Sequence, residues 1–240
     1  MKKYFVMFLG LIFSLSILAQ EKMNDPNVEK RDVKNFHAIK VSSAFDVYIT
    51  QGSEEALAVS ASELEYRDRI RTSVDNGVLK IWFDNEKKFW KGFSGNKMKL
   101  KAYISFKDID RLDINGACNV NIIGTIKTDD LNIDLSGASD LHGELDVKNL
   151  TVGLSGASDM KVSGTVSKMK IGVSGASDFK GFDLVTDYCD AEASGASGVK
   201  ITVNKELSAR ASGASDVGYK GDGVIRNIHT SGASSISKRS

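Results

Sequence analysis

Apolar and polar residues alternate along the second half of the chain. Leu131, Ile133 and Leu135 are separated by single polar residues, and a similar run covers residues 150–154. The side chains of a β-strand alternate between its two faces, so this period of two predicts strands with one buried face. Amphipathic helices would need a period near 3.6 residues, and helical repeats are therefore disfavoured.

A glycine-centred motif separates these strands and recurs along the chain. Two adjacent copies read LSGASDL and LSGASDM, and the copies are centred on Gly116, Gly137, Gly156, Gly175, Gly195, Gly213 and Gly232. The centres are 18 to 21 residues apart. A near-constant period of this length is typical of a solenoid, in which each unit buries its apolar face by stacking on the next unit.

These patterns predict an all-β fold, a single-stranded parallel β-helix with coils of about 19 residues. Leucine-rich repeats are disfavoured because the units lack both an asparagine ladder and a helical segment. Within each motif, we expect the glycine to form a bend at positive φ and the alanine to fit inside a tight corner. We expect the serines and the aspartate to hydrogen-bond free backbone groups of the turn.

The region before the repeats has a different pattern. Residues 27–110 are predicted to form a β-rich capping part, and residues 111–240 the β-helix repeats. FHAIKVSSAFDVYITQG reads as two strands, in which residues 42–47 look like a divergent copy of the corner motif. ALAVSA and VLKIWF read as further strands. A cap is expected because an unpaired end of a β-helix is an edge that favours aggregation.

Two smaller features concern the ends of the rod. SELEYRDRIRTSV is expected to hold a short helix capped by Ser62, within the capping part. The other end of the chain reads SISKRS, and we expect the charges of Lys238 and Arg239 to discourage stacking there.

The first residues predict export. Residues 1–20 have the layout of a secretory signal peptide, with two lysines, an apolar run and then Ala19. Removing the two lysines would change the balance from 32 basic and 31 acidic residues to 30 and 31. A chain so close to neutral is not expected to bind nucleic acid. No later apolar stretch is long enough for a transmembrane span, so we expect the periplasm, the outer membrane or the cell surface.

The two cysteines are expected to remain free thiols. Cys189 aligns with Leu131 and should point inward, whereas Cys118 takes the place of the second serine of the motif. Three to four coils separate them, which corresponds to roughly 14 to 19 Å. A disulfide requires Cα atoms within about 7 Å.

Entry strands followed by serine-glycine-alanine repeats resemble the putative auto-transporter adhesin family with the head GIN domain, found in envelope proteins of Gram-negative bacteria. FHAIKVSSAFDVYITQG resembles the entry segment of that family, and the LSGASDL copies resemble its repeats. The resemblance covers one continuous domain over about residues 34–236. It implies an exported β-helical protein without known catalytic residues.

The best candidate site is the column that equivalent motif positions form when coils stack. Asp140, Asp159 and Asp178 are expected on consecutive coils. Neighbouring carboxylates repel by roughly 1 kcal/mol in water, and a cation bound between them would relieve this repulsion. The alternative interpretation is that they are solvated turn residues that bind no metal.

A second candidate is the segment NEKKFWKGFSGNK. Phe89, Trp90 and Phe93 lie among its lysines in an expected loop. Exposed aromatic rings can stack on a sugar or anchor a partner protein. The alternative is that these rings fold back and cover the end of the rod.

No catalytic residue or cofactor is predicted. His37, His142 and His229 form no metal-binding helix, and the cysteines lack zinc spacing. We therefore favour a non-enzymatic exported binding or adhesion module whose partner is a glycan or an envelope or host protein. Two alternatives stay open: a glycan-active β-helical enzyme, and a structural periplasmic protein that assembles through its ends. The oligomeric state is left open.

Overall fold

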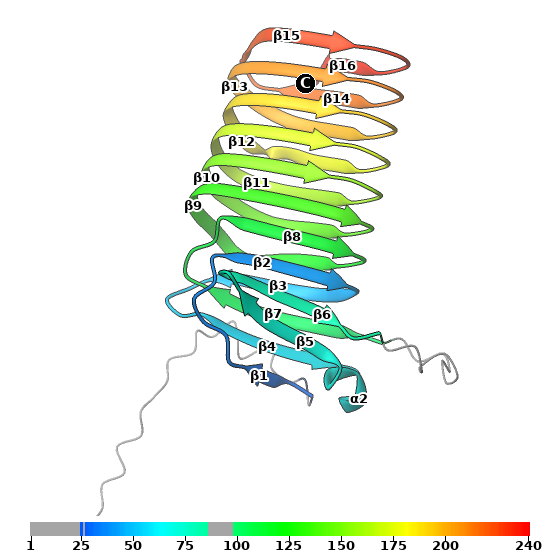
Figure 1. Ribbon diagram of the computed structural model, residues 1–240. Helices are drawn as coiled ribbons and strands as arrows, with labels where there is room; N and C mark the ends of the chain where they lie inside the picture. The colour runs from blue at the N-terminus through cyan, green and yellow to red at the C-terminus, as the bar shows by residue number, and fades with distance from the viewer. Residues whose placement is uncertain (1–24, 26, 86–97) are drawn as a thin grey trace, which may run out of the picture.

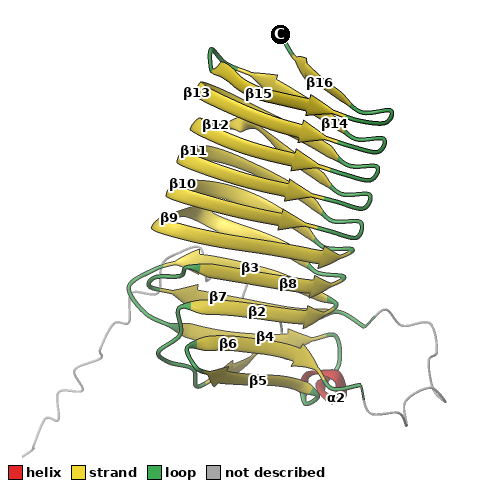
Figure 2. Cartoon of the chain, turned by 45° about the horizontal axis from the view of Figure 1, so that its top comes forward, coloured by secondary structure: helices red, strands yellow, loops and turns green. Residues whose placement is uncertain are grey.

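The computed structural model describes residues 25, 27–85 and 98–240. These residues form an almost entirely β structure, in which strands stack along a rod (Figure 1). The helix drawn in Figure 2 lies at the N-terminal end of the rod. The predicted signal peptide, residues 1–20, lies outside the described residues.

Long strands form the middle of the rod, and each pairs in parallel with the next one along the chain. The register joins equivalent positions of successive repeats, such as Leu150 with Met169 and Met169 with Cys189. The predicted parallel β-helix with coils of about 19 residues is confirmed. The strands are β9 (Asn119–Gly137), β10 (Asp140–Leu154), β11 (Asp159–Val173), β12 (Asp178–Ala193) and β13 (Gly198–Ala211).

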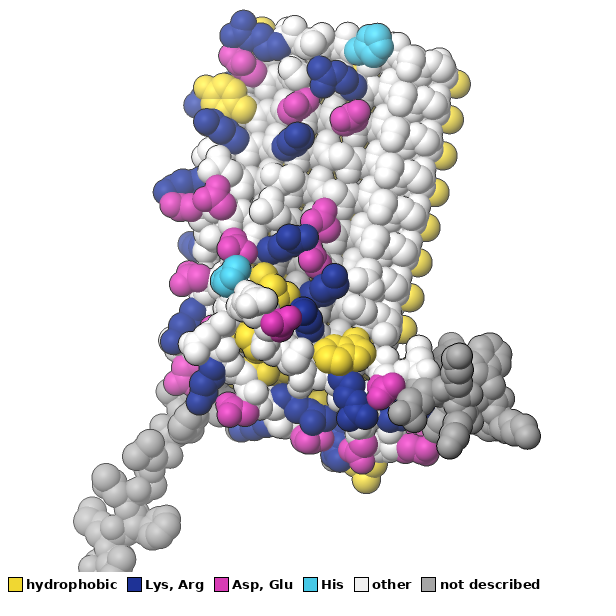
Figure 3. Space-filling model, viewed as in Figure 1, with side chains coloured by type: hydrophobic (Ala, Val, Ile, Leu, Met, Phe, Trp, Pro, Cys, Tyr) yellow, Lys and Arg dark blue, Asp and Glu magenta, His cyan; other side chains and the backbone are white. Residues whose placement is uncertain are grey.

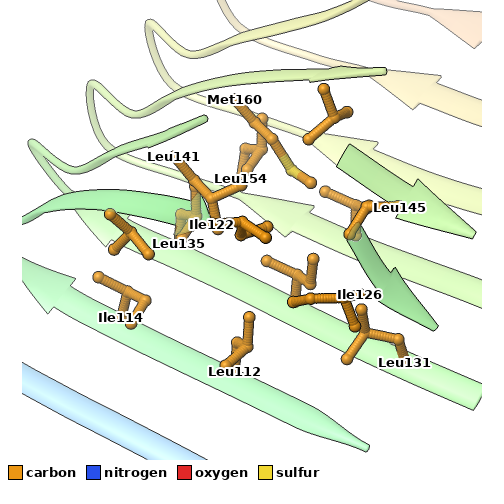
Figure 4. Close-up of a cluster of buried hydrophobic side chains, with 14 of the residues drawn as sticks. Leu112, Ile114, Ile122, Ile126, Leu131, Leu135, Leu141, Leu145, Leu154 and Met160 are labelled. Carbon is orange, nitrogen blue, oxygen red and sulfur yellow. The ribbon is translucent and has the colours of Figure 1, made fainter. Parts of the chain in front are cut away.

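The glycine-centred corner divides each coil between two sheets. Strand segments that precede the corner, such as residues 149–154, lie on the near side of the rod in Figure 1 and are called the front sheet. Segments that follow the corner, such as residues 159–161, are called the back sheet. Inward side chains of both sheets form one continuous apolar core, part of which is shown in Figure 4 around Leu135, Leu145 and Leu154.

The N-terminal strands are interleaved with the coils instead of stacking in chain order. β2 (Ala38–Ser43) and β3 (Phe45–Gln51) form one coil, and Ser43 pairs with Gly116. Residues 42–47 are therefore a corner of the rod, as predicted. This coil lies between its neighbours β6 (Val78–Phe83) and β7 (Leu100–Phe106) on one side, and β8 (Arg111–Gly116) and β9 on the other.

Antiparallel strands cover the N-terminal end. β4 (Ala56–Ala61) pairs with β7, β5 (Ile70–Asp75) pairs with β6, and β1 (Glu29–Arg31) pairs with β4. The short helix α2 (Leu64–Arg67) lies between β4 and β5 in the chain.

The expected cap of this helix is wrong. The N-cap residue is Glu63, and it makes no side-chain capping hydrogen bond. Ser62 lies one position before the N-cap. Its hydroxyl oxygen instead accepts a hydrogen bond from the Lys99 backbone N–H at 3.4 Å.

The C-terminal end of the rod is open. β15 (Val224–Thr230) and β16 (Ser235–Lys238) form the last coil, after β14 (Asp216–Lys220), and each pairs on one side only. Ile225 and Ile228 are 42% and 40% exposed, although they align with buried residues of β13. Arg239 turns back to the preceding coil, where its Nη2 lies 3.0 Å from Asp216 Oδ2. That Lys238 and Arg239 discourage stacking at this end stays a prediction.

Hydrogen exchange should be fastest in this last coil. Its backbone groups have pairing partners on one side, and its side chains bury little apolar surface, so it opens at lower free-energy cost than the middle of the rod. Exchange mass spectrometry should find lower protection in peptides from residues 224–238 than in peptides from residues 140–193. Equal protection of both sets would contradict this prediction.

The corner glycines have the predicted backbone conformation. All seven lie at positive φ, between 73° and 105°, and Ser43 takes the same position at 91°. The alanine was placed wrongly. Ala138 and its equivalents are exposed, and the next residue, Ser139, is buried instead. The bend at the glycine turns the alanine outward, and Figure 3 shows a row of hydrophobic side chains along this edge.

The second serine of the motif forms a buried ladder through the corner. Ser158 Oγ donates to the Ser155 carbonyl at 3.0 Å and accepts a hydrogen bond from the Ser139 N–H at 3.4 Å. The Ser158 N–H in turn donates to Ser177 Oγ at 3.1 Å. The serines therefore satisfy backbone groups of the turn, as predicted, and link each coil to the next.

Candidate functional site

The predicted aspartate column is present on the back sheet. Asp140 pairs in register with Asp159, and Asp159 pairs with Asp178. The column continues below Asp140 through Asn119 to Asp46, whose carboxylate accepts a 3.0 Å hydrogen bond from the Asn119 amide. Polar corner residues thus line up along the rod because the repeat period equals one coil.

The structure places a cation in this column that the sequence analysis missed. Lys180 Nζ lies 2.5 Å from Asp159 Oδ2 and 4.0 Å from Asp178 Oδ2. The hydrogen bond to Asp159 raises the pKa of Lys180. The signal was its position two residues after Asp178, which puts both side chains on the same face of one strand. Binding of a metal ion by the column stays a prediction.

Replacing Lys180 tests whether its ammonium group stands in for a metal ion. Because its pKa is raised, the stabilisation is complete below the unfolded pKa and is lost only as the pH rises through the folded value. It is therefore fully present at pH 7. We expect Lys180→Gln to lower the free energy of unfolding by about 0.5 kcal/mol at low salt.

Calcium should then raise the melting temperature of Lys180→Gln more than that of the parent, because the carboxylates lose their cation. The matched control is Lys161→Gln, which removes a neighbouring exposed lysine of the same sheet. Equal calcium responses in both variants would contradict the expectation that Lys180 stands in for a metal ion.

Both cysteines are buried free thiols, as predicted. Cys118 occupies the buried serine position, where its thiol contacts the carbonyl oxygens of Ser43 at 3.5 Å and Asn115 at 3.7 Å. Burial raises the pKa of Cys118, and it raises the pKa of Cys189 to about 12.

The two thiols should therefore resist alkylation in the folded protein, because thiolate is the reactive form. At pH 8 we expect iodoacetamide to add to both cysteines in denaturant and to neither without it, as measured by intact mass. Rapid modification of folded Cys189 would contradict its burial among the inward side chains.

The outer surface of the front sheet carries a groove of about 640 Å³. Its walls come from five successive coils. Asn149, Lys168, Tyr188 and Glu206 follow one another in register, and Arg226 of β15 adds the fifth coil. This groove was not predicted from the sequence, because its residues belong to no motif. The signal was their spacing by one repeat period.

The remaining candidates are not brought together. The segment with Phe89, Trp90 and Phe93 lies outside the described residues, between β6 and β7. His37 Nδ1 lies 2.9 Å from Asp110 Oδ2 at an exposed position near the N-terminal end. Among residues 25, 27–85 and 98–240, no group of three or more His, Cys, Asp or Glu side chains is arranged to hold a metal ion.

Comparison with known families matches residues 35–223 to the family described as "putative auto-transporter adhesin, head GIN domain". The match covers most of the chain. This protein belongs to that family. The resemblance of its entry strands and repeats is thereby confirmed. The search of curated proteins found no match.

Solved structures share the fold of this family member. A putative adhesin from Bacteroides fragilis has 21% identity and a TM-score of 0.80, with 88% of this chain and 96% of that chain covered. A putative lipid binding protein from Parabacteroides distasonis has 21% identity and a TM-score of 0.68, with 91% and 98% covered. A putative adhesin from Parabacteroides merdae has 15% identity and a TM-score of 0.62, with 91% and 98% covered.

The described part of the chain is built mostly of strands. It contains no helix that combines the length and the apolar character needed to cross a bilayer.

Proposed function

We propose that this protein is a non-enzymatic binding module that is exported to the bacterial cell envelope. The observation that carries the proposal is the sharing of surface grooves by successive coils. One groove of about 610 Å³ and another of about 640 Å³ each take lining residues from at least four coils. A repeated rigid surface of this kind suits the binding of an extended ligand.

The state of the acidic side chains supports binding over catalysis. Several carboxylates of the coils are paired with cations of neighbouring coils, as in Glu206 with Arg226 at 2.7 Å and Asp129 with Lys148 at 2.8 Å. Arg226 lowers the pKa of Glu206. A general acid requires a carboxyl group that keeps its proton near neutral pH, and such pairing favours the ionised form instead.

The family and the first residues support export and adhesion. The family is described as putative auto-transporter adhesins, and solved relatives from Bacteroides and Parabacteroides are described in similar terms. Residues 1–20 have the composition of a signal peptide. The partner is a glycan or a protein of the envelope or the host, and the periplasm and the cell surface are both consistent with export.

Protease treatment of intact cells tests this proposal, with the protein detected by an antibody. Digestion without lysis would place the rod outside the cell, and protection until the outer membrane is opened would place it in the periplasm. Recovery in the cytoplasmic fraction would contradict export. Release of reducing sugar from envelope polysaccharides by the purified protein would contradict a non-enzymatic role.

A further inference from the structure

The groove on the front sheet has a chemistry that identifies a class of ligand. We propose that it binds an acidic polysaccharide, with the Tyr188 ring stacking on a sugar and Lys168 and Lys170 binding its carboxylate or sulfate groups. This inference rests on the proposed binding function and names the ligand class.

The aromatic ring is exposed beside a lysine. Tyr188 is 40% exposed and stands at the start of the front-sheet segment of β12. The Lys205 ammonium lies 5.6 Å from the centre of its ring, and Lys205 is itself held by Asp187 at 2.8 Å. An exposed aromatic ring on a polar surface offers an apolar face to the C–H groups of a sugar.

Two exposed lysines line the groove, and Lys170 is paired in register with Asp190 on the next coil. Lys168 and Lys170 are exposed, and neither forms an ion pair with a residue of the described ranges. The other charges of the groove are engaged with each other or with the next coil. Glu206 pairs with Arg226 at 2.7 Å, and Asp190 lies 3.9 Å from Arg210. The groove therefore presents an excess of positive charge that favours an anionic ligand.

A second row of polar residues completes the surface of the groove. Thr151, Lys170, Asp190 and Ser208 follow one another in register and form a second row beside the row that contains Tyr188. The Asn149 amide and the hydroxyl groups of Thr151 and Ser208 can both donate and accept hydrogen bonds, as sugar hydroxyls require. A glycan therefore finds stacking, charge and hydrogen-bonding partners within one groove.

The spacing of the coils favours a polymer over a small anion. The groove crosses five coils, and successive coils are separated by about 4.8 Å. One sugar unit of an extended polysaccharide advances by a similar length. Successive sugars can therefore contact successive coils, and Lys168 and Tyr188 lie on adjacent coils.

Binding should be measured by calorimetry with the purified protein at low salt. The probes are alginate oligosaccharides, chondroitin sulfate oligosaccharides and sialylated oligosaccharides, with neutral cellohexaose for comparison. We expect an acidic probe to bind and the neutral probe to bind at least about tenfold more weakly. Binding should weaken as salt is added, because the lysine contacts are exposed to solvent.

Matched variants locate the site. Lys168→Gln with Lys170→Gln should weaken binding by about tenfold, and Tyr188→Ala by a similar factor. Tyr188→Phe keeps the ring and should bind like the parent. The control is Lys161→Gln with Lys200→Gln, which removes two exposed lysines from the back sheet. Unchanged melting curves would establish that each variant is folded.

Several results would overturn the proposal. Equal weakening by the front-sheet and back-sheet variants would show that only the overall charge attracts the glycan. Binding to vesicles of phosphatidylglycerol but to none of the acidic probes would assign the groove to lipid, and no binding to any probe would remove the glycan assignment. None of these results concerns location, so export remains tested separately by protease treatment of cells.

Discussion

Replacing Gly175 by alanine should destabilise the rod by about 3 to 5 kcal/mol. Gly175 has φ of +75°, and a Cβ atom added there would lie 2.5 Å from the backbone oxygen of Gly156 on the coil beneath. That oxygen already accepts a 2.8 Å hydrogen bond from the Ala176 N–H. The added methyl group must therefore strain the backbone and separate two coils at the same time.

The neighbouring Gly172 provides the matched control. It lies near the end of β11, three residues before Gly175, but its φ is not in the positive range and an added Cβ would have no atom within 4 Å. Gly172→Ala should be neutral or stabilising by up to about 1 kcal/mol, because alanine reduces the freedom of the unfolded chain. Urea unfolding of both variants measures the difference. Equal free energies of unfolding would show that the corner tolerates a side chain.

The repeat made the coils predictable, because its period aligns equivalent residues on neighbouring coils. Once Gly156 is placed above Gly137, the alignment of Asp159 with Asp140 follows from sequence spacing alone. The direction in which each corner side chain points could not be predicted from this spacing. Alanine and serine are both small, and the bend at the glycine decides which of them points inward.

The order of the N-terminal coils could not be predicted from the sequence. Which strands pair there depends on which strand edges remain free after the chain folds back, and no sequence motif indicates these pairs. β2 pairs with β6 and with β8, so neighbours in space are far apart in the chain. In the chain, β6 and β7 are joined by residues 84–99, whose sequence lacks the glycine motif of the other corners.

Part of the candidate surface could have been found from the period. Lys168 and Tyr188 are 20 residues apart, so stacking would have placed them together. The residue type at this position differs from coil to coil, whereas the predictions from the sequence rested on residues that are repeated. A repeated position marks what every coil needs for folding, as at the corner. Tyr188 is a residue that is not repeated on an otherwise regular surface. Such residues can serve a function that is specific to this protein.

Replacing Ser158 by alanine should cost about 1 to 3 kcal/mol. The hydroxyl group is fully buried, donates to the Ser155 carbonyl and accepts from the Ser139 N–H. Removing it leaves polar backbone groups of two coils without their partner in a place that water does not reach. Urea unfolding at constant m-value would measure the loss.

The corner itself suggests the variant that should restore much of this stability. Cys118 occupies the equivalent position one coil before Ser139, and its thiol contacts the same kind of carbonyl oxygen, that of Asn115, at 3.7 Å. Ser158→Cys should therefore lose less stability than Ser158→Ala, even though the cysteine side chain is larger, because the thiol is a weak donor. If cysteine proved as destabilising as alanine, the fit of the side chain, and not the hydrogen-bonded ladder, would determine the residue at this position.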